Sequence, residues 1–572
     1  MTIPEIAIPK GARRVGVLHP NRQMSLTVVL ATKEPLPSIH GANSRNRTMI
    51  ANRRTKPAHM THAELRRRYG PIAGSVKLVE KFAKSFKLRV IETATDRRSI
   101  RLSGRAADVS RAFNTEFEEF ELKGNKFFAP VRPLQMPADW RGVVEAVLGI
   151  HSSPHSSPRR HSSIHEKKPA ATLPDLARAY EFPPDFNGTG ETIGLIEFGG
   201  GFRLEDIKAF CSRMGLVEPS ITVVEIGSGK NHPASRRAIH DLVDAMSGKL
   251  TLAAKTEQSD SFLDAQSTFE VTMDVEILAA LAPAAHIVVY FASGGEQGLY
   301  HAISHAVHDK RHRPSILSVS WSLAEPDISD IELNAIENLL IEAAHLGITV
   351  CASSGDWGAL NGSRNGQPSV NYPASSPHCL ACGGTSGKID SAGISEEEVW
   401  NATHYGVKGA SGGGVSARFQ LPRWQRHAKV PERPRGGPGR GVPDVAGLAD
   451  PRYGCELLIA GRTVASAGTS AVAPMWAALV ARLNQALGRR CGHFHSHIYQ
   501  LGSSHAAALR PVLKGNNGLY RAGKGWNACV GYGTPRGEEL LAHLRHELDV
   551  SEKATLSSRT KSKSNPAVLL TN

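Results

Sequence analysis

Between residues 171 and 548, apolar runs of strand length alternate with amphipathic segments, and this alternation limits the possible folds more than any other feature. The amphipathic segments repeat their apolar residues about every three to four positions, as helices do. This alternation predicts an α/β fold with a doubly wound, mostly parallel sheet covered by helices on both faces. The apolar runs are TIGLIEF, AHIVVYFA, PSILSVSWS and GITVCASSG, and two helical segments are RLEDIKAFCSRMG and IELNAIENLLIEAAHLG.

Residues 22–150 have a different pattern and form a predicted domain of their own, preceded by an N-terminal extension over residues 1–21. The pattern begins with a strand, RQMSLTVVLAT, and continues with two helices, two strands and a third helix. Thr61 and Glu64 have the spacing of a capping box at the start of the first helix. With a last strand near TEFEEFE, this order predicts an α+β ferredoxin-like sandwich.

Two segments lack the composition of a folded core. Residues 151–170 read HSSPHSSPRRHSSIHEKKPA, which is rich in Ser, Pro and His and contains basic pairs. Such a sequence cannot bury a core, so it predicts a flexible, cleavable linker in front of a domain over residues 171–548. Residues 549–572 are also polar and basic, and they predict a disordered tail.

Charge and composition exclude several classes of function. The 572 residues have a formal net charge of +15, but no long Lys/Arg run lies beside aromatic residues, so we do not expect nucleic-acid binding. No apolar stretch reaches about 18 residues, so no membrane span is expected. The N-terminal residues lack the continuous apolar region of a secretory signal peptide.

The seven cysteines do not predict a disulfide scaffold, because their number is odd and they are spread over a long chain. Cys379 and Cys382 have CxxC spacing, but a zinc site would need a second pair at similar spacing, which the sequence lacks. We therefore expect small buried thiols.

Ser470 is the first candidate for a catalytic residue. It lies in ASAGTSAVAPMWAALVARLNQALG, residues 465–488, where small residues lead into an apolar helix with Pro474 in its first turn. The N-terminus of a helix favours the negative charge that develops when a serine attacks a carbonyl group. A serine in this position is also an ordinary helix cap, so the motif alone leaves both interpretations open.

A serine nucleophile needs a base, which is histidine in subtilisin-type hydrolases. The candidates here are two carboxylates, Glu270 and Asp274, in QSTFEVTMDVEILAALAPAAHIVVYFA. This segment fits a strand, in which their backbones are ~13 Å apart, or a helix, in which they are ~6 Å apart. Only the helix lets the two carboxyl groups form a hydrogen bond. A plain surface pair is the alternative.

Asp356 is a third acid, and it follows the predicted strand in GITVCASSGDWG. Sites in α/β proteins assemble at the carboxyl ends of parallel strands. A protonated Asp356 could donate a hydrogen bond to the oxyanion of a tetrahedral intermediate. The alternative is a role as a turn cap between glycines.

Together these motifs resemble those of the sedolisin (serine-carboxyl) peptidases, most of all the kumamolisin-like members with an N-terminal prodomain. The resemblance runs from about residue 22 to about residue 545 and implies a subtilisin-like catalytic domain. It implies that Ser470 is the nucleophile and Glu270 its general base. It further implies that Asp274 orients Glu270 and that Asp356 is the oxyanion acid. The shared strings are EVTMD, CASSGDWG, GTSAVAP, SVSWS, NYPASSP, LACGGT and SGGGVS.

The same resemblance implies supporting residues, a substrate class and a mode of regulation. Glu197 in LIEFGGG and Trp321 in SVSWS would extend the hydrogen-bond network behind the acids. A carboxylate base is ionised in mild acid, so we expect a serine-type endopeptidase that cleaves proteins or peptides at acidic pH. We also expect a secreted, monomeric proenzyme whose prodomain is an intramolecular inhibitor, with autoprocessing in the linker. A catalytically silent binding protein of the same fold is the alternative.

The sequence departs from the family where the resemblance implies a calcium site. The family's ligands are two carboxylates and three backbone carbonyls. Pro511 and Asn527 stand here in place of the two carboxylates, whereas Val512, Gly523 and Gly525 keep the carbonyl groups. Calcium favours charged oxygen ligands, so we expect a weakened or lost calcium site. No other cofactor is predicted.

Overall fold

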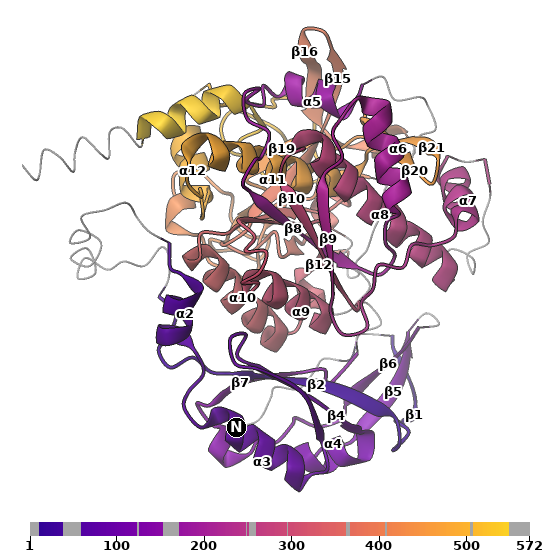
Figure 1. Ribbon diagram of the computed structural model, residues 1–572, viewed down its shortest axis with the longest axis vertical. Helices are drawn as coiled ribbons and strands as arrows, with labels where there is room; N and C mark the ends of the chain where they lie inside the picture. Colours follow the sequence, from indigo (N-terminus) through magenta and orange to yellow (C-terminus); the bar gives the residue numbers. More distant parts are fainter. Residues whose placement is uncertain are drawn as a thin grey trace, which may run out of the picture.

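The chain forms two domains that pack against each other (Figure 1). The N-terminal domain comprises the described residues up to 152, and the large domain begins at residue 171. The predicted linker, from residue 153 on, and the predicted tail lie outside the described residues. The structure is a computed structural model and describes residues 8, 11–37, 59–122, 125–152, 171–247, 249–250, 259–294, 296–361, 366–405, 409–503 and 507–547.

The large domain is built on one mostly parallel sheet, which confirms the predicted fold class. Its strand order is β16-β15-β13-β11-β8-β10-β9, and β19 pairs with β15. All pairs are parallel except β15–β16, which is a hairpin at the edge. The strands are β8 (Thr192–Phe198), β9 (Ser220–Glu225), β10 (His286–Ala292), β11 (Ile316–Val319), β13 (Thr349–Ser353), β15 (Leu380–Asp390), β16 (Gly393–Val399) and β19 (Val445–Leu448).

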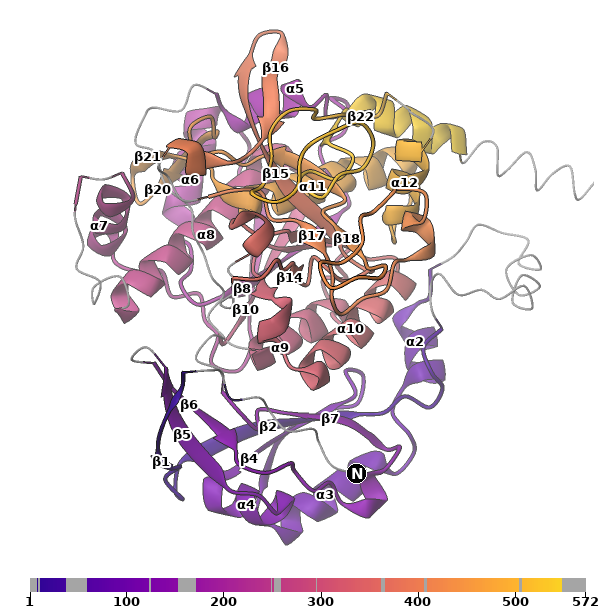
Figure 2. The ribbon, with the colours of Figure 1, turned by 180° about the vertical axis from the view of Figure 1, so that it is seen from behind.

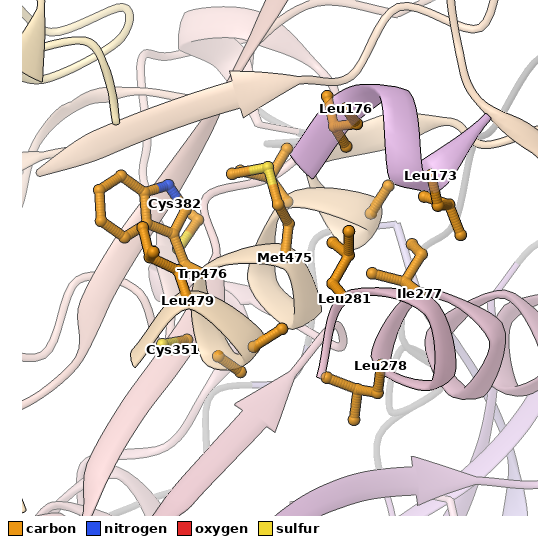
Figure 3. Packing of buried hydrophobic residues seen from close by; sticks show 14 of the residues in the cluster. Leu173, Leu176, Ile277, Leu278, Leu281, Cys351, Cys382, Met475, Trp476 and Leu479 are labelled. Atoms are coloured by element: carbon orange, nitrogen blue, oxygen red, sulfur yellow. The ribbon is translucent and has the colours of Figure 1, made fainter. Parts of the chain in front are cut away.

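Helices cover both faces of this sheet, as a doubly wound fold requires. Helices α8 (Asp260–Leu281) and α11 (Gly468–Leu487) pack on one face, and α9 (Glu296–Val307) and α10 (Asp330–His345) pack on the other. Figure 3 shows the first of these cores, in which Met475 of α11 lies near Leu281 of α8, and Trp476 lies near Cys382. The other helices of the domain include α5 (Leu173–Ala179), α6 (Leu204–Met214), α7 (Arg236–Met246) and α12 (His495–Ser503).

Helix α8 resolves the ambiguity of the segment that carries Glu270 and Asp274. It is a helix of 22 residues, and the hydroxyl group of its N-cap Ser259 accepts a hydrogen bond from the amide of Phe262. Nearly every residue of its second half is buried, whichever way it faces. A helix that is buried all round has no polar face, which explains why its sequence lacks a helical period.

The N-terminal domain has the predicted ferredoxin-like core, but one strand of the prediction was wrong. Its antiparallel sheet has the order β3-β4-β2-β7, with α3 and α4 packed on it. The fourth strand is VEAVL, whereas TEFEEFE forms β5 of a separate sheet, β1-β5-β6. Because β1 pairs with β5, the predicted extension adds a strand to this domain. The elements are β1 (Arg13–Val17), β2 (Gln23–Leu30), α2 (His62–Tyr69), α3 (Ser75–Ser85), β3 (Arg89–Ala94), β4 (Ser99–Arg105), α4 (Ala106–Phe113), β5 (Phe117–Leu122), β6 (Asn125–Pro130) and β7 (Val144–Leu148).

Two expectations about cysteines and membranes can be compared with the structure. Cys379 and Cys382 are buried free thiols, as predicted. Of the helices in the described part of the chain, none has the length and apolar character needed to cross a bilayer.

The N-terminal domain packs on α9 and α10 of the large domain (Figures 1 and 2). A buried ion pair crosses the interface, with Arg98 Nη2 2.8 Å from Glu342 Oε1. Arg98 also contacts Glu145 at 3.1 Å, and His308 contacts Glu342 at 2.9 Å. Burial alone would raise the pKa of Glu342, but the charge of Arg98 and the hydrogen bond to His308 lower it to about 2. Removing one partner of such a pair leaves a buried charge uncompensated.

Two histidines of α9 face the N-terminal domain. The Nε2 atom of His301 lies 3.0 Å from Thr27 Oγ1 of β2. Burial lowers the pKa of His301 to about 3, and the charges of His305, Arg101 and Arg97 act in the same direction. Burial and the charge of Arg97 lower the pKa of His305 to about 4. Both rings therefore stay neutral in the docked state until the pH falls to about 4.

Acid should weaken the docking of the N-terminal domain on α9. A histidine in solvent takes up a proton below a pKa of about 6.5, so the undocked state binds more protons than the docked state. Each histidine can therefore lower the equilibrium constant of docking by up to about tenfold per pH unit. This effect extends from about pH 6.5 down toward the pKa values of the docked state. Glu92, which favours protonated His305, reduces this effect. We expect amide exchange in β2 and β4, corrected for intrinsic rates, to increase between pH 7 and 4.5 relative to β10.

The matched variant is His301→Gln combined with His305→Gln, because glutamine can contact Thr27 and does not titrate. Both chains would carry Ser470→Ala, which removes the candidate nucleophile and keeps the chain intact in acid. The histidine variant should show a flatter dependence of exchange on pH. The same dependence in both chains would contradict the prediction.

Candidate active site

The first residues of α11 bring Ser470 to the carboxyl ends of the central strands. The helix starts at Gly468 and packs on β11, β13 and β15. Ser470 is half-buried, and its hydroxyl group donates a hydrogen bond of 3.4 Å to the carbonyl oxygen of Ser320, which follows β11. The hydroxyl group therefore lies at the edge of the sheet where α/β sites assemble.

The position of Pro474 differs from the prediction. Because α11 begins at Gly468, Pro474 lies inside the helix and beyond its first turn. A proline has no N–H group, so it cannot donate the helical hydrogen bond to the carbonyl of Ser470 four residues before it. The hydroxyl group of Ser320 lies 3.2 Å from this carbonyl oxygen.

Glu270 and Asp274 lie in the buried part of α8, one helical turn apart. Glu270 is 3% exposed and Asp274 is 0% exposed. The hydroxyl group of Ser320 donates a hydrogen bond of 2.6 Å to Asp274 Oδ2. Ser320 thus contacts both Asp274 and Ser470, which connects the acid pair to the candidate nucleophile.

Asp356 lies in the turn after β13, next to the start of α11. Its Oδ1 atom accepts two hydrogen bonds of 2.8 Å, from the backbone N–H and from the hydroxyl group of Thr469. Burial raises the pKa of Asp356 to about 7, since the donors of Thr469 do not offset burial and the negative charge of Glu270 adds to it. Asp356 is therefore protonated in acid, and Glu270 is near enough to affect it.

Glu197 and Trp321, the residues expected to support the acids, contact each other. Glu197 lies in β8, and its Oε2 atom accepts a hydrogen bond of 2.8 Å from Trp321 Nε1. Both side chains are buried, with 0% and 4% exposure. The ring of Trp321 also packs edge-on against Phe198, with 5.3 Å between ring centroids. This pair fixes the end of β8 against the segment that follows β11.

The loop of the predicted calcium site does not fit a calcium ion. Asn527 Nδ2 lies 3.5 Å from the carbonyl oxygen of Gly523, so an N–H donor faces one of the expected ligands. Asn527 Oδ1 accepts hydrogen bonds of 3.2 Å from the amides of Cys529 and Val530. Pro511 offers no side-chain oxygen. Within the described residues, no cluster of three or more His, Cys, Asp or Glu side chains could hold a metal.

Three residues of the site were not singled out in the sequence. Thr469 holds Asp356, and Ser320 contacts Asp274 and Ser470. Gly468 has a φ of +77°, and a Cβ atom there would lie 2.5 Å from Asp356 Oδ2. The strings GTS and SVSWS contain these residues, but neither string tells which atoms meet.

The fold and the site together define a serine peptidase of the serine-carboxyl class. The sheet and its helices are subtilisin-like, and Asp356 is bound to Thr469, the residue next to Ser470 at the start of α11. Comparisons with known proteins agree with this class. The family described as "Pro-kumamolisin, activation domain" matches residues 10–153.

Kumamolisin from Bacillus sp. (strain MN-32) is 34% identical over 548 residues, which cover 92% of this chain and 93% of kumamolisin. Sedolisin from Pseudomonas sp. (strain 101) is 29% identical over 483 residues, 80% of this chain and 76% of sedolisin. A solved structure of Pseudomonas sedolisin (serine-carboxyl proteinase) with two molecules of pseudo-iodotyrostatin aligns with a TM-score of 0.56 and 26% identity. It covers 66% of this chain and 99% of that chain. The chain belongs to the sedolisin family of serine-carboxyl peptidases, and it carries the family's N-terminal prodomain.

The close approach of Gly468 to Asp356 predicts a loss of activity in Gly468→Ala. The new methyl group would displace the carboxyl group, and a positive φ costs alanine about 1–2 kcal/mol. Gly488→Ala at the other end of α11 is the matched control, because Gly488 has a φ of +59° and no atom near its Cβ position. Both variants should lose a few degrees of melting temperature. Only Gly468→Ala should lose most of its peptide hydrolysis, and equal activity in the two variants would contradict this prediction.

Proposed function

We propose that this protein is an endopeptidase that hydrolyses peptide bonds in acid through Ser470, Glu270 and Asp274, with Asp356 as the oxyanion acid. The observation that carries the proposal is the anchoring of Asp356 by Thr469, the residue next to Ser470. Two donors hold Asp356 Oδ1, which leaves Oδ2 to carry the proton. A neutral carboxylic acid beside a serine nucleophile is suited to donate a hydrogen bond to an oxyanion.

In the proposed mechanism, Glu270 takes the proton of Ser470 Oγ as this oxygen attacks the carbonyl carbon of the peptide bond. The carbonyl oxygen becomes an oxyanion, which accepts hydrogen bonds from Asp356 and from the backbone N–H of Ser470. Glu270 then gives its proton to the leaving amine, and an acyl-enzyme remains. A water molecule then attacks the acyl-enzyme while Glu270 takes its proton, and Ser470 Oγ regains a proton as the carboxylic acid product leaves. Asp274 holds Glu270 in position throughout.

The chemistry of these groups sets the pH range. Glu270 must be ionised to act as a base, and a carboxyl group ordinarily ionises above a pH of about 4.3. Asp356 must be protonated, and its pKa of about 7 marks where this is lost. Activity should therefore be greatest in mild acid and fall as the pH rises through 7.

Ser470→Ala should abolish hydrolysis of acid-denatured haemoglobin, by a factor on the order of 10⁴ or more. Asp356→Asn tests the oxyanion role, because an amide still accepts from Thr469 and still donates, but it does not titrate. This variant should keep measurable activity at pH 4 and lose the decline that wild type shows near pH 7. Maximal wild-type activity at pH 8, or full activity of Ser470→Ala, would contradict the proposal.

We propose that the N-terminal domain acts as an intramolecular inhibitor that is removed by self-cleavage in residues 151–170. The match to a Pro-kumamolisin activation domain supports this role. The N-terminal domain also packs on α9 and α10 of the large domain, as an intramolecular inhibitor would. We further propose that the protein acts on protein or peptide substrates outside the cell, as a monomer.

We propose that folding requires no tightly bound calcium, since both carboxylate positions of the family's site have changed. Wild type should melt at the same temperature, within about 1 °C, in calcium and in a chelator. A variant with Pro511→Asp and Asn527→Asp should instead melt several degrees higher in calcium, because a ligand of the folded state stabilises it. Each single substitution serves as a control. A large drop in the wild-type melting temperature on chelation would contradict the prediction.

A further inference from the structure

Ser320 lies at the point where β11, α8 and α11 meet. It directly follows β11 and is 8% exposed. Its hydroxyl oxygen is 2.6 Å from Asp274 Oδ2 and 3.2 Å from the carbonyl oxygen of Ser470. Its own carbonyl oxygen accepts a hydrogen bond of 3.4 Å from the hydroxyl group of Ser470 and one of 2.9 Å from the hydroxyl group of Ser353. One residue therefore contacts the acid pair and the nucleophile through different atoms.

The hydroxyl group of Ser320 has one proton to donate, and its two acceptors differ. The contact with Asp274 is shorter, and hydrogen bonds to carboxylates are shorter and stronger than those to neutral groups. The carbonyl of Ser470 is the weaker acceptor, although Pro474 leaves it without its helical partner. The proton of Ser320 therefore points to Asp274.

We infer that Ser320 is a positioning residue for the peptidase reaction, which holds Asp274 through its hydroxyl group and Ser470 through its carbonyl group. This inference rests on the proposed roles of Asp274 and Ser470. Ser320 takes part in no bond that is made or broken. It keeps the carboxyl group of Asp274 correctly turned, so that Asp274 can in turn hold Glu270.

The carbonyl contact defines the resting position of the nucleophile. At 3.4 Å, the hydrogen bond from Ser470 Oγ to the Ser320 carbonyl is long and weak. The hydroxyl group of Ser470 can therefore leave it at little cost and turn to Glu270 when substrate binds. Ser353 keeps a shorter bond to the same carbonyl, so the backbone stays in place when Ser470 leaves.

The chain offers a close control in Ser318, two residues earlier on the same strand. Alternation along β11 puts Ile316, Ser318 and Ser320 toward α8 and α11, whereas Leu317 and Val319 face the other core. Ser318 is 0% exposed, and its hydroxyl group has no hydrogen-bond partner among the described residues. Ser318→Ala thus removes a buried hydroxyl group from the same face without removing a hydrogen bond.

The test compares kcat and KM of Ser320→Ala, Ser318→Ala and wild type from pH 3 to 7. The substrate is a quenched fluorescent peptide built on a cleavage site found in denatured haemoglobin. We expect kcat of Ser320→Ala to fall by about 10- to 100-fold with little change in KM. Asp274 and Glu270 titrate as a pair, and a pair that loses a donor holds its negative charge less well, so the acidic limb of the profile should move up by about one pH unit. Ser318→Ala should keep the wild-type profile.

Ser320→Cys is the second variant, since a thiol is a weaker donor of similar size. It should move the acidic limb in the same direction by a smaller amount. An unshifted acidic limb in the folded alanine or cysteine variant would overturn the inference, as would an equal shift in Ser318→Ala. Failure of the proposed function looks different, because wild type would then show no hydrolysis that depends on Ser470.

Discussion

The packing of α8 against α11 on one face of the sheet is the contact on which the catalytic arrangement depends. α8 carries the carboxyl groups and α11 carries the serine, so their relative position decides whether these groups can react. The contact is close-packed and apolar, and such interiors shift little. Asp274 lies inside this packing with no exposure. In water, the carboxyl groups of Glu270 and Asp274 would each be hydrated, and nothing would keep them close to each other.

The pKa values of buried carboxyl groups in this protein shift in opposite directions, because their partners differ. Glu342 lies beside Arg98, which more than offsets burial and keeps the pKa near 2. Asp356 has uncharged donors and a second carboxylate nearby, and its pKa rises to about 7. Burial also raises the pKa of Glu276 on α8, although the amide of Leu458 donates to it. Charged and neutral acids thus coexist at one pH, one at a domain interface and one beside the nucleophile.

The sequence predicted the sheet, its helices and the acids of the site, because strand-length apolar runs and ordered motifs are local signals. It left α8 undecided, since a helix buried on all sides has no periodic pattern. The strand VEAVL was missed in favour of TEFEEFE, because alternation identifies a strand but not the sheet that it joins. Ser320 had no signal of its own, since its role comes from a hydroxyl group that contacts α8 and a carbonyl group that contacts α11, two helices distant in the sequence.

Acidity acts on two separate parts of this molecule in the same direction. Beside the nucleophile, lowering the pH below 7 protonates Asp356 and supplies the proposed oxyanion donor. On α9, the covered His301 and His305 stay neutral in mild acid, whereas uncovered histidines would take up protons there, so the same change favours release of the N-terminal domain. Histidine could not be the base of such a site, because it would be protonated where the prodomain leaves. A carboxylate base is ionised in that range, so the proposed role of Glu270 is compatible with an interface that His301 and His305 line.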